Sequence, residues 1–287
     1  MRLINRFDPW QAPLCTCPAK LTFNPYTGCD HECIYCYASS YVPDFHNCRP
    51  KKDLLKRLEQ EAGKLNGEIL SVSNSSDPYP NLEAETGLMR ESLKILTRHK
   101  CRIQIITKSD TVARDVDLLR EVPSMVALTI TTDDDAIAET IEPNAPLPTK
   151  RLKALETLVA KLIPTAVRID PIIPTVNDRP EKLIETIARI GAKHVTASTY
   201  KVKPDNWQRL TKALPKTAEK LKPLYFEQGT KTGGNLYLSR DLRLRLMKNV
   251  ADLTKKHGMK FGTCREGLDQ LNTATCDGTW LAETEGR

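Results

Sequence analysis

Short apolar runs alternate with segments of helical periodicity along most of this 287-residue chain. Each strand–helix–strand unit of this kind favours a parallel sheet with right-handed crossovers, so the alternation restricts the fold more than any other feature. Apolar side chains recur at helical spacing in Leu54, Leu58, Ala62 and Leu65, for example. The runs, rich in Val, Ile and Thr, predict strands at 21–26, 68–73, 102–107, 125–131, 165–170 and 194–199.

These units end near residue 215, whereas a complete eight-fold barrel takes about 250 residues. We therefore expect an α/β fold, a partial (β/α)6 TIM-like barrel of parallel strands with a C-terminal α/loop extension. The expected parts are an N-terminal segment over 1–20, the barrel over 21–220 and the extension over 221–287, packed on the barrel. The extension contains a Gly-rich stretch, a helix over about 240–257 and two cysteine-bearing loops.

Nine cysteines are unusual for a chain that does not use them, and their odd number excludes complete pairing into disulfides. Clustered cysteines in a reducing compartment more often bind metal or do redox chemistry. No apolar run approaches the roughly 18 residues of a membrane span. The first residues also lack the apolar core of a secretory signal peptide. We expect a cytoplasmic protein with no membrane partner.

The charge is mildly basic, with 43 Lys and Arg against 36 Asp and Glu, a net +7. Basic and acidic residues are interleaved, as in KKDLLKRLEQEAGK at 51–64. This pattern is typical of a solvated helix surface, which we favour over a nucleic-acid surface, although the charge is compatible with both.

Three cysteines follow the first predicted strand at the spacing C-x3-C-x2-C: Cys29, Cys33 and Cys36. Iron–sulfur clusters usually take four protein thiolates, so a loop with three leaves one iron open for chemistry. The loop comes at the C-terminal end of a strand, where barrel enzymes keep their active sites. The spacing predicts a 4Fe–4S cluster on this loop.

The alternative is a zinc site in which His31 is the fourth ligand. Tetrahedral sites with three cysteines and one histidine exist. We favour the cluster, because His31 lies inside the tight cysteine loop and zinc-binding cysteines usually come as two separated pairs. The zinc alternative would make the chain a zinc-stabilised nucleic-acid-binding protein without catalysis.

The triplet and its surroundings resemble the radical S-adenosylmethionine (SAM) superfamily. The fuller string NPYTGC…CIYCYA is similar to the spore photoproduct lyase-like branch, also called DNA repair photolyase-like proteins. The resemblance runs from about residue 15 to the C-terminus. It is supported by SNSSDPYPNLEAETGLMR (73–90), ITKSD (106–110), TITT (129–132), EPNAP (142–146), RIDPIIP (168–174), CREG (264–267) and CDG (276–278).

The resemblance implies an enzyme in which the reduced cluster cleaves SAM to a 5′-deoxyadenosyl radical, which then takes hydrogen from a substrate. The cofactor supplies this chemistry, and the protein supplies orientation. A one-electron reductant such as ferredoxin or flavodoxin is implied as a partner. Nucleic acid or a nucleoside is the substrate class that the branch suggests. A third reading keeps the fold but uses the cluster only for electron transfer.

Strand-end positions and the resemblance together give candidate SAM contacts. Short polar side chains follow the second strand, and a lysine that suits a carboxylate ends the third. The aromatic residue between the last two cysteines resembles the superfamily's neighbour of the adenine. The candidates are Tyr35, Ser75, Ser76, Asp77, Lys108, Thr129, Thr131 and Arg168.

The chain departs from spore photoproduct lyase at Asn74, where the lyase has a cysteine that returns hydrogen to the product radical. Tyr35 and Tyr37 match the lyase's pair of tyrosines, so they and Cys264, a spare thiol, are candidate catalytic residues. The spare cysteines have three readings: an auxiliary iron–sulfur cluster or zinc ion, a redox-active hydrogen donor, or simple buried packing. The candidate second metal site consists of Cys15, Cys17, Cys264 and Cys276.

Overall fold

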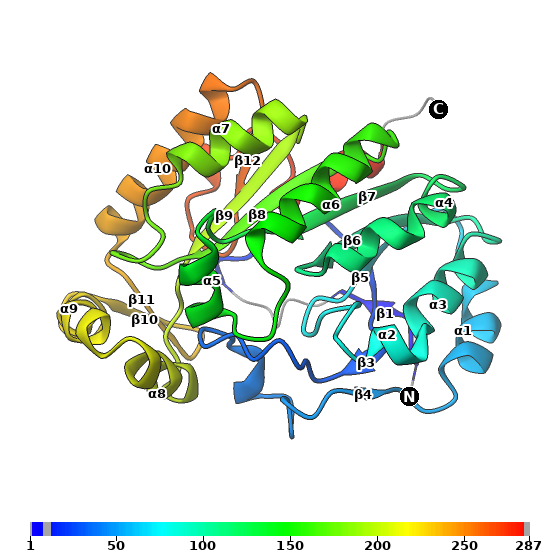
Figure 1. Ribbon diagram of the computed structural model, residues 1–287, viewed down its shortest axis with the longest axis horizontal. Helices are drawn as coiled ribbons and strands as arrows, with labels where there is room; N and C mark the ends of the chain where they lie inside the picture. Colours follow the sequence, from blue (N-terminus) through cyan, green and yellow to red (C-terminus); the bar gives the residue numbers. More distant parts are fainter. Residues whose placement is uncertain (1, 8–12, 284–287) are drawn as a thin grey trace.

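The computed structural model describes residues 2–7 and 13–283, and a curved sheet runs through its centre (Figure 1). The strand order is β1-β2-β5-β6-β7-β8-β9-β12. The strand β1 runs antiparallel to β2, and the other neighbours in this order run parallel. The bounds are β1 Asn5–Arg6, β2 Leu21–Phe23, β5 Ile69–Val72, β6 Arg102–Thr107, β7 Ser124–Thr129, β8 Thr165–Ile172, β9 His194–Thr199 and β12 Lys260–Thr263.

Helices follow the sheet from one edge to the other along its outer side (Figure 1). This row consists of α1 Leu54–Ala62, α3 Leu88–Leu96, α4 Val116–Leu119, α6 Pro148–Ala160, α7 Glu181–Ile190 and α10 Arg240–Lys256. The remaining helices and strands lie at the ends of the sheet: α2 Glu83–Thr86, α5 Asp135–Ile141, α8 Pro204–Ala213, α9 Pro215–Phe226, and the two-stranded sheets β3 Tyr26–Thr27 with β4 Arg49–Pro50 and β10 Thr230–Thr232 with β11 Asn235–Tyr237. Six parallel strands, β2 and β5 to β9, therefore form the predicted partial barrel.

Successive side chains of a strand point to opposite faces of the sheet, and the two faces here differ in polarity. Residues such as Ile105, Val167 and Val195 belong to the main apolar core with the outer helices. The alternate positions include Gln104, Arg168, Thr196 and Ser198. The interior of the barrel is therefore partly polar, which suits a binding site.

The C-terminal part of the chain completes the barrel. Strand β12 pairs with β9 at the edge of the sheet, a strand that the sequence did not predict. A short 3-10 helix, η4 (Thr279–Ala282), places Leu281 and Ala282 in an apolar cluster with Met125, Ala127 and Ala166. The fold class is confirmed, and residues 221–283 share its core. The division at residues 20 and 220 stays a prediction.

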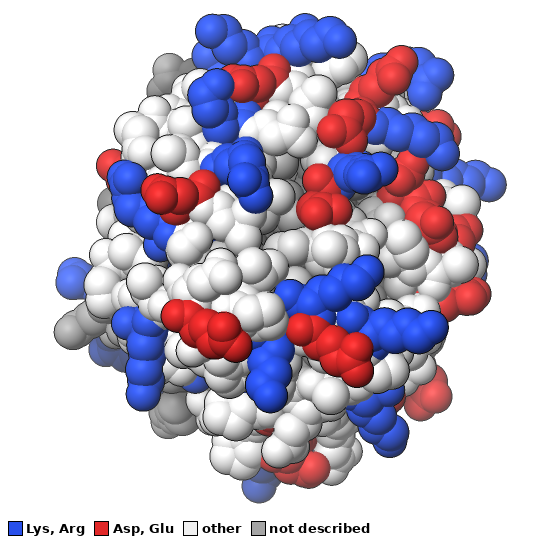
Figure 2. Space-filling view, turned by 90° about the vertical axis from the view of Figure 1, so that its left-hand side faces the viewer, with Lys and Arg blue, Asp and Glu red and all other residues white. Residues whose placement is uncertain are grey.

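The charged surface agrees with the interleaved sequence pattern. Figure 2 shows lysine and arginine side chains intermixed with aspartate and glutamate over the face that it presents. Within the described ranges, no helix combines the length and the apolar character needed to cross a membrane.

Candidate active site

The cysteine loop is held by backbone hydrogen bonds and by side chains of α8. Cys29 N donates to Phe45 O at 2.8 Å, and Cys36 N donates to Cys33 O at 3.1 Å. Gly28 has φ +80°, and a Cβ there would meet Phe45 O at 2.4 Å, so this position requires glycine. These bonds and this glycine fix the path of the loop backbone.

Two residues of α8 satisfy the carbonyl groups of the same loop. Asn206 Nδ2 donates to Tyr35 O at 3.1 Å, and Arg209 Nη2 donates to Cys36 O at 2.6 Å. Sequence reasoning missed both residues, because an Asn and an Arg on a helix are ordinary surface residues in sequence. Only the burial of Asn206 reveals the role.

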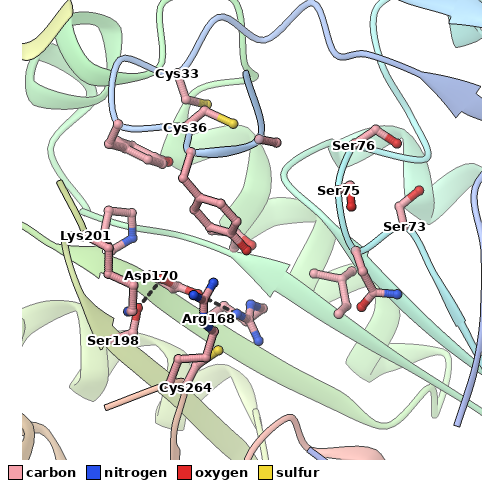
Figure 3. Close-up of a pocket in the computed structure, with 18 of the residues that line it drawn as sticks. Cys33, Cys36, Ser73, Ser75, Ser76, Arg168, Asp170, Ser198, Lys201 and Cys264 are labelled. Carbon is pink, nitrogen blue, oxygen red and sulfur yellow. Dashed lines mark hydrogen bonds and ion pairs between the residues drawn. The ribbon is translucent and has the colours of Figure 1, made fainter. Parts of the chain in front are cut away.

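All three cysteines line one cavity of about 390 Å³ at the C-terminal ends of the barrel strands. Figure 3 shows Cys33 and Cys36 on the wall opposite Arg168, Asp170 and Cys264. Ser73, Ser75 and Ser76 lie along a third side in the same view. The cavity therefore brings the predicted cluster cysteines together with most predicted SAM contacts.

The loop after β5 that carries Ser73, Ser75 and Ser76, called the serine loop below, is held by Asp77. This carboxylate accepts from Thr107 Oγ1 at 2.6 Å and from Lys108 N at 2.8 Å. Both of its oxygens are thus engaged with protein. Nearby, Ser73 Oγ and Ser76 Oγ are buried and have no hydrogen-bond partner among the described residues. Ser73 also has a left-handed φ of +63°, a strained conformation of the kind found at functional sites.

Tyr35, within the cysteine loop, is held in place by the buried carboxylate of Glu142. Its hydroxyl donates a short hydrogen bond to Glu142, which also accepts from Thr131 Oγ1 at 2.9 Å. Glu142 is paired with Arg151, with 2.5 Å between Oε2 and Nη2. The Thr131 hydroxyl is therefore engaged with Glu142, whereas Thr129 lines the cavity. Neither Glu142 nor Arg151 was predicted as part of the site.

Burial favours the protonated form of the three loop thiols. Burial raises the pKa of Cys33 to about 12, and the nearby Lys108 partly opposes this effect. Burial likewise raises the pKa values of Cys29 and Cys36. A metal that binds there must displace protons, and a lysine beside the thiols favours the thiolate form. Lys108 Nζ also lies 5.4 Å from the centroid of the Tyr35 ring.

The three loop cysteines supply the ligand type that an iron–sulfur cluster takes. Among residues 2–7 and 13–283, no set of three or more His, Cys, Asp or Glu is placed to hold one metal ion. In a cubane each thiolate binds a different iron, so the sulfurs need not converge on one point. His31 is turned toward Asp77, with 3.7 Å between Nδ1 and Oδ2. The set of three cysteines, open on one side to the cavity, fits a cluster.

The opposite wall carries two networks of charged residues. Arg168 forms a close ion pair with Asp170, which also accepts a short hydrogen bond from Ser198. Cys264 lies near Arg168. Lys201 Nζ lies 3.0 Å from Glu266 Oε1, and Arg243 Nη1 lies 3.5 Å from Glu266 Oε2. Sequence analysis did not place Lys201 or Ser198 in the site.

Tyr37 and the spare cysteines also reach this cavity. Arg265 Cζ lies 5.5 Å from the centroid of the Tyr37 ring. Cys17 and Cys276 are in contact, with 3.7 Å between their sulfurs, and Cys15 lies near Cys17. The fourth predicted member, Cys264, makes its contact with Arg168. All four cysteines line the cavity.

Comparisons with known proteins agree with this site. Residues 23–187, more than half of the chain, match the sequence model of the Radical SAM superfamily, and the chain belongs to that superfamily. Family membership implies a 4Fe–4S cluster and SAM, and it supports an enzyme. An uncharacterized protein of Methanocaldococcus jannaschii is 35% identical over 173 residues, which cover 56% of this chain and 63% of that protein.

An uncharacterized protein of Mycobacterium tuberculosis is 26% identical over 198 residues, which cover 63% of this chain and 58% of that protein. The matched region thus spans about three-fifths of each of these relatives. Among solved structures, spore photoproduct lyase complexed with dinucleoside spore photoproduct has a TM-score of 0.62 at 16% identity, covering 81% of this chain and 71% of that one.

A radical SAM methyltransferase, TsrM, from Kitasatospora setae has a TM-score of 0.57 at 14% identity, covering 91% of this chain and 57% of that one. At such identities the likeness shows the fold alone. The chain therefore has a fold like that of spore photoproduct lyase.

Proposed function

We propose that this protein is a radical SAM enzyme that holds a 4Fe–4S cluster through Cys29, Cys33 and Cys36. The observation that carries the proposal is that three thiols on one rigid loop open into the same cavity as two buried serine hydroxyls without partners. When bound, the cluster and SAM supply a 5′-deoxyadenosyl radical that takes hydrogen from the substrate. A ferredoxin or a flavodoxin is the proposed electron donor.

Within this proposal, the chain's own residues orient SAM. The free hydroxyls of Ser73 and Ser76 supply hydrogen bonds to its polar groups, since a buried hydroxyl without a partner is costly. Lys108 supplies a positive charge beside the cysteine loop for the SAM carboxylate. Asp77 acts by holding the serine loop and Lys108 in register. Tyr35, Ser75, Thr129 and Arg168 remain proposed SAM contacts, and Thr131 acts through Glu142.

The lining of the cavity favours an anionic substrate. Its basic side chains outnumber its acidic ones, with Lys20, Lys108, Arg168, Lys201, Lys203 and Arg265 against Asp77, Asp170 and Asp277. Three of the basic groups are paired with carboxylates: Lys20 with Asp277, Arg168 with Asp170, and Lys201 with Glu266. The remainder suits phosphate or carboxylate groups, so a nucleotide or nucleic acid is the proposed substrate class. Cys264 and Tyr37, which also line the cavity, are proposed to face the substrate.

Metal content distinguishes this proposal from the zinc alternative. Protein purified without oxygen and reconstituted with iron and sulfide is expected to bind about four irons and to show the brown colour of a cluster. Cys33→Ala is expected to lose it, whereas Cys101→Ala is expected to keep it, because Cys101 is buried outside the cavity. Stoichiometric zinc without iron would instead support the nucleic-acid-binding protein.

Binding of a labelled single-stranded DNA oligonucleotide tests the substrate class. Lys203→Ala is expected to weaken binding and to reduce the slope of log K against log salt by about 1. The control is Lys248→Ala, because Lys248 lies on α10, away from the cavity. Equal salt slopes for wild type and both variants would count against an anionic ligand in the cavity.

A further inference from the structure

The segment before β2 and the segment after β12 bring a pair of thiols together inside the cavity. Cys17 precedes β2 and Cys276 follows β12, yet their sulfurs are 3.7 Å apart across 259 residues of sequence. A disulfide requires a separation of about 2.05 Å, so the two sulfurs must approach each other by roughly 1.7 Å to form one. Neither residue belongs to a helix or strand, so this approach breaks no backbone ladder.

The position of Cys276 is built into the barrel. Its carbonyl accepts from Thr196 Oγ1 at 2.9 Å. Strand β12 has glycine at the contact, because a Cβ on Gly262 would meet Cys276 Cα at 2.6 Å. On the other side, Asp277 forms a buried ion pair with Lys20, three residues after Cys17. Both thiols are therefore held in place by contacts of their neighbours.

The two thiols differ in access. Cys276 has an exposed fraction of 3%, whereas Cys17 is half-buried. Cys15 lies near Cys17 and adds a third thiol. A half-buried thiol in contact with a buried thiol is the arrangement that closure to a disulfide requires. Cys15 opposes but does not cancel the effect of Cys276 and of burial, which raise the pKa of Cys17, so exchange is expected to be slow near pH 7 and faster in alkaline buffer.

We propose that Cys17 and Cys276 are a redox-active dithiol that closes reversibly to a disulfide within the cavity. A low-molecular-weight disulfide such as glutathione disulfide is the oxidant. The Cys17 thiolate attacks it, its S–S bond breaks, and one glutathione leaves as a thiol. Cys276 then attacks the mixed disulfide and releases the second glutathione. The protein loses two electrons and two protons, which reduce glutathione disulfide to two glutathione molecules.

The proposal stands apart from the cluster and SAM, since it uses none of the three loop cysteines. Its test is made on the full chain under nitrogen, with and without reconstitution. The protein is equilibrated in glutathione buffers of increasing disulfide content, its free thiols are blocked with N-ethylmaleimide, and it is digested with trypsin. The fragments are convenient, because residues 266–287 contain Cys276 alone and residues 7–20 contain Cys15 and Cys17.

We expect mass spectrometry to find residues 7–20 joined to residues 266–287, and the link to disappear with dithiothreitol. Cys15→Ser is expected to keep the link, which assigns it to Cys17. Cys17→Ser and Cys276→Ser are each expected to reduce it strongly. The matched control is Cys48→Ser, because Cys48 is half-buried like Cys17 but does not line the cavity.

Three results would overturn the proposal. One is glutathione retained on Cys17 as a stable mixed disulfide while Cys276 stays free. Another is a link that forms only after urea is added, since the native contact would then be irrelevant. The third is a zinc ion that copurifies and protects Cys17 and Cys276 from N-ethylmaleimide until a chelator is added, which would make the thiols metal ligands.

Discussion

At the scale of single residues, the cysteine loop depends on buried charges that do not bind metal. Glu142 receives the Tyr35 hydroxyl and is paired with Arg151, and both charged side chains have an exposed fraction of 0%. Removing one partner of such a pair leaves the other charge buried and unpaired, which costs more than the pair itself contributes. The ionised carboxylate of Glu142 thus supports the cysteine loop through its hydrogen bond with Tyr35.

Glu142→Gln is expected to lower the free energy of unfolding by about 3 kcal/mol at pH 7, because the Arg151 charge loses its counterion. Urea titration followed by circular dichroism measures this loss. Glu91→Gln, at an exposed ion pair with Lys94, is the control and is expected to change stability by less than about 1 kcal/mol. Equal effects of the two substitutions would contradict the buried role.

The loss should also depend on pH. Burial alone would raise the pKa of Glu142. The charges of Arg151 and Lys108 lower this pKa by more than burial raises it, so the net pKa lies below its usual value of 4.5. A lowered carboxyl pKa means that the stabilisation is complete above about pH 4.5 and is lost as pH falls through the lowered pKa. The difference between wild type and Glu142→Gln is therefore expected to shrink below pH 4.5. A constant difference down to pH 3 would count against this account.

At the scale of elements, the edge strand β12 packs closely on the loop that carries Cys276. Gly262 has no space for a side chain there, because its Cβ would lie 2.6 Å from Cys276 Cα and 2.7 Å from Cys276 O. These are backbone atoms, which cannot move without displacing the loop. The register of β12 against β9 and the position of the loop thus depend on one glycine.

Gly262→Ala is expected to destabilise the protein by about 1–3 kcal/mol, as overpacking against backbone does. A lowered midpoint of thermal unfolding would show it. Gly63→Ala is a matched control, because the nearest atom to its Cβ is His99 Cε1 at 4.0 Å. A midpoint of thermal unfolding for Gly262→Ala equal to that of wild type would contradict this role of Gly262.

Sequence patterns predicted where strands lie better than they predicted which strands pair in the sheet. The strands at 102–107 and 194–199 have the predicted bounds, because long runs of β-branched residues are buried on both faces. The first predicted strand, 21–26, ends instead at Phe23. The edge strand β12 was missed because Lys260–Thr263 is short and contains glycine, so its structure comes from pairing with β9.

In the candidate site, too, local features could be predicted from the sequence and long-range contacts could not. Cys29, Cys33 and Cys36 are recognisable because their spacing is local. The Glu142–Arg151 pair was missed, because burial of a charged residue is decided by tertiary packing rather than by its neighbours in sequence. The contact of Cys17 with Cys276 joins residues 259 positions apart. No spacing rule predicts such a contact.

At the scale of the whole molecule, the segment before β2 and the segment after β12 close the interior of the barrel. Lys20 is paired with Asp277, and Trp280 Nε1 donates to His194 Nδ1 at 3.3 Å. The His194 nitrogen accepts this bond only when it is unprotonated. Burial lowers the pKa of His194 to about 4. The hydrogen bond between Trp280 and His194 should therefore be lost in acid.

A lowered histidine pKa means that the unfolded chain binds more protons between pH 6.5 and 4, so stability falls as pH drops through this window. We expect His194 to account for a loss of about 2 kcal/mol between pH 7 and pH 4.5. In His194→Gln the pH dependence of urea unfolding is expected to be smaller by that amount. An unchanged pH dependence in the variant would contradict this role of His194.

The measurement that tests the central claim most directly is 5′-deoxyadenosine formation from SAM by reconstituted, dithionite-reduced protein. The account predicts that wild type and Cys101→Ala form it. Cys29→Ala, Cys33→Ala and Cys36→Ala are expected to lose at least about 100-fold in rate, since loss of a ligand abolishes the cluster. If the three variants cleave SAM as fast as wild type, or if iron-loaded wild type does not cleave it, the assignment of this cavity is wrong.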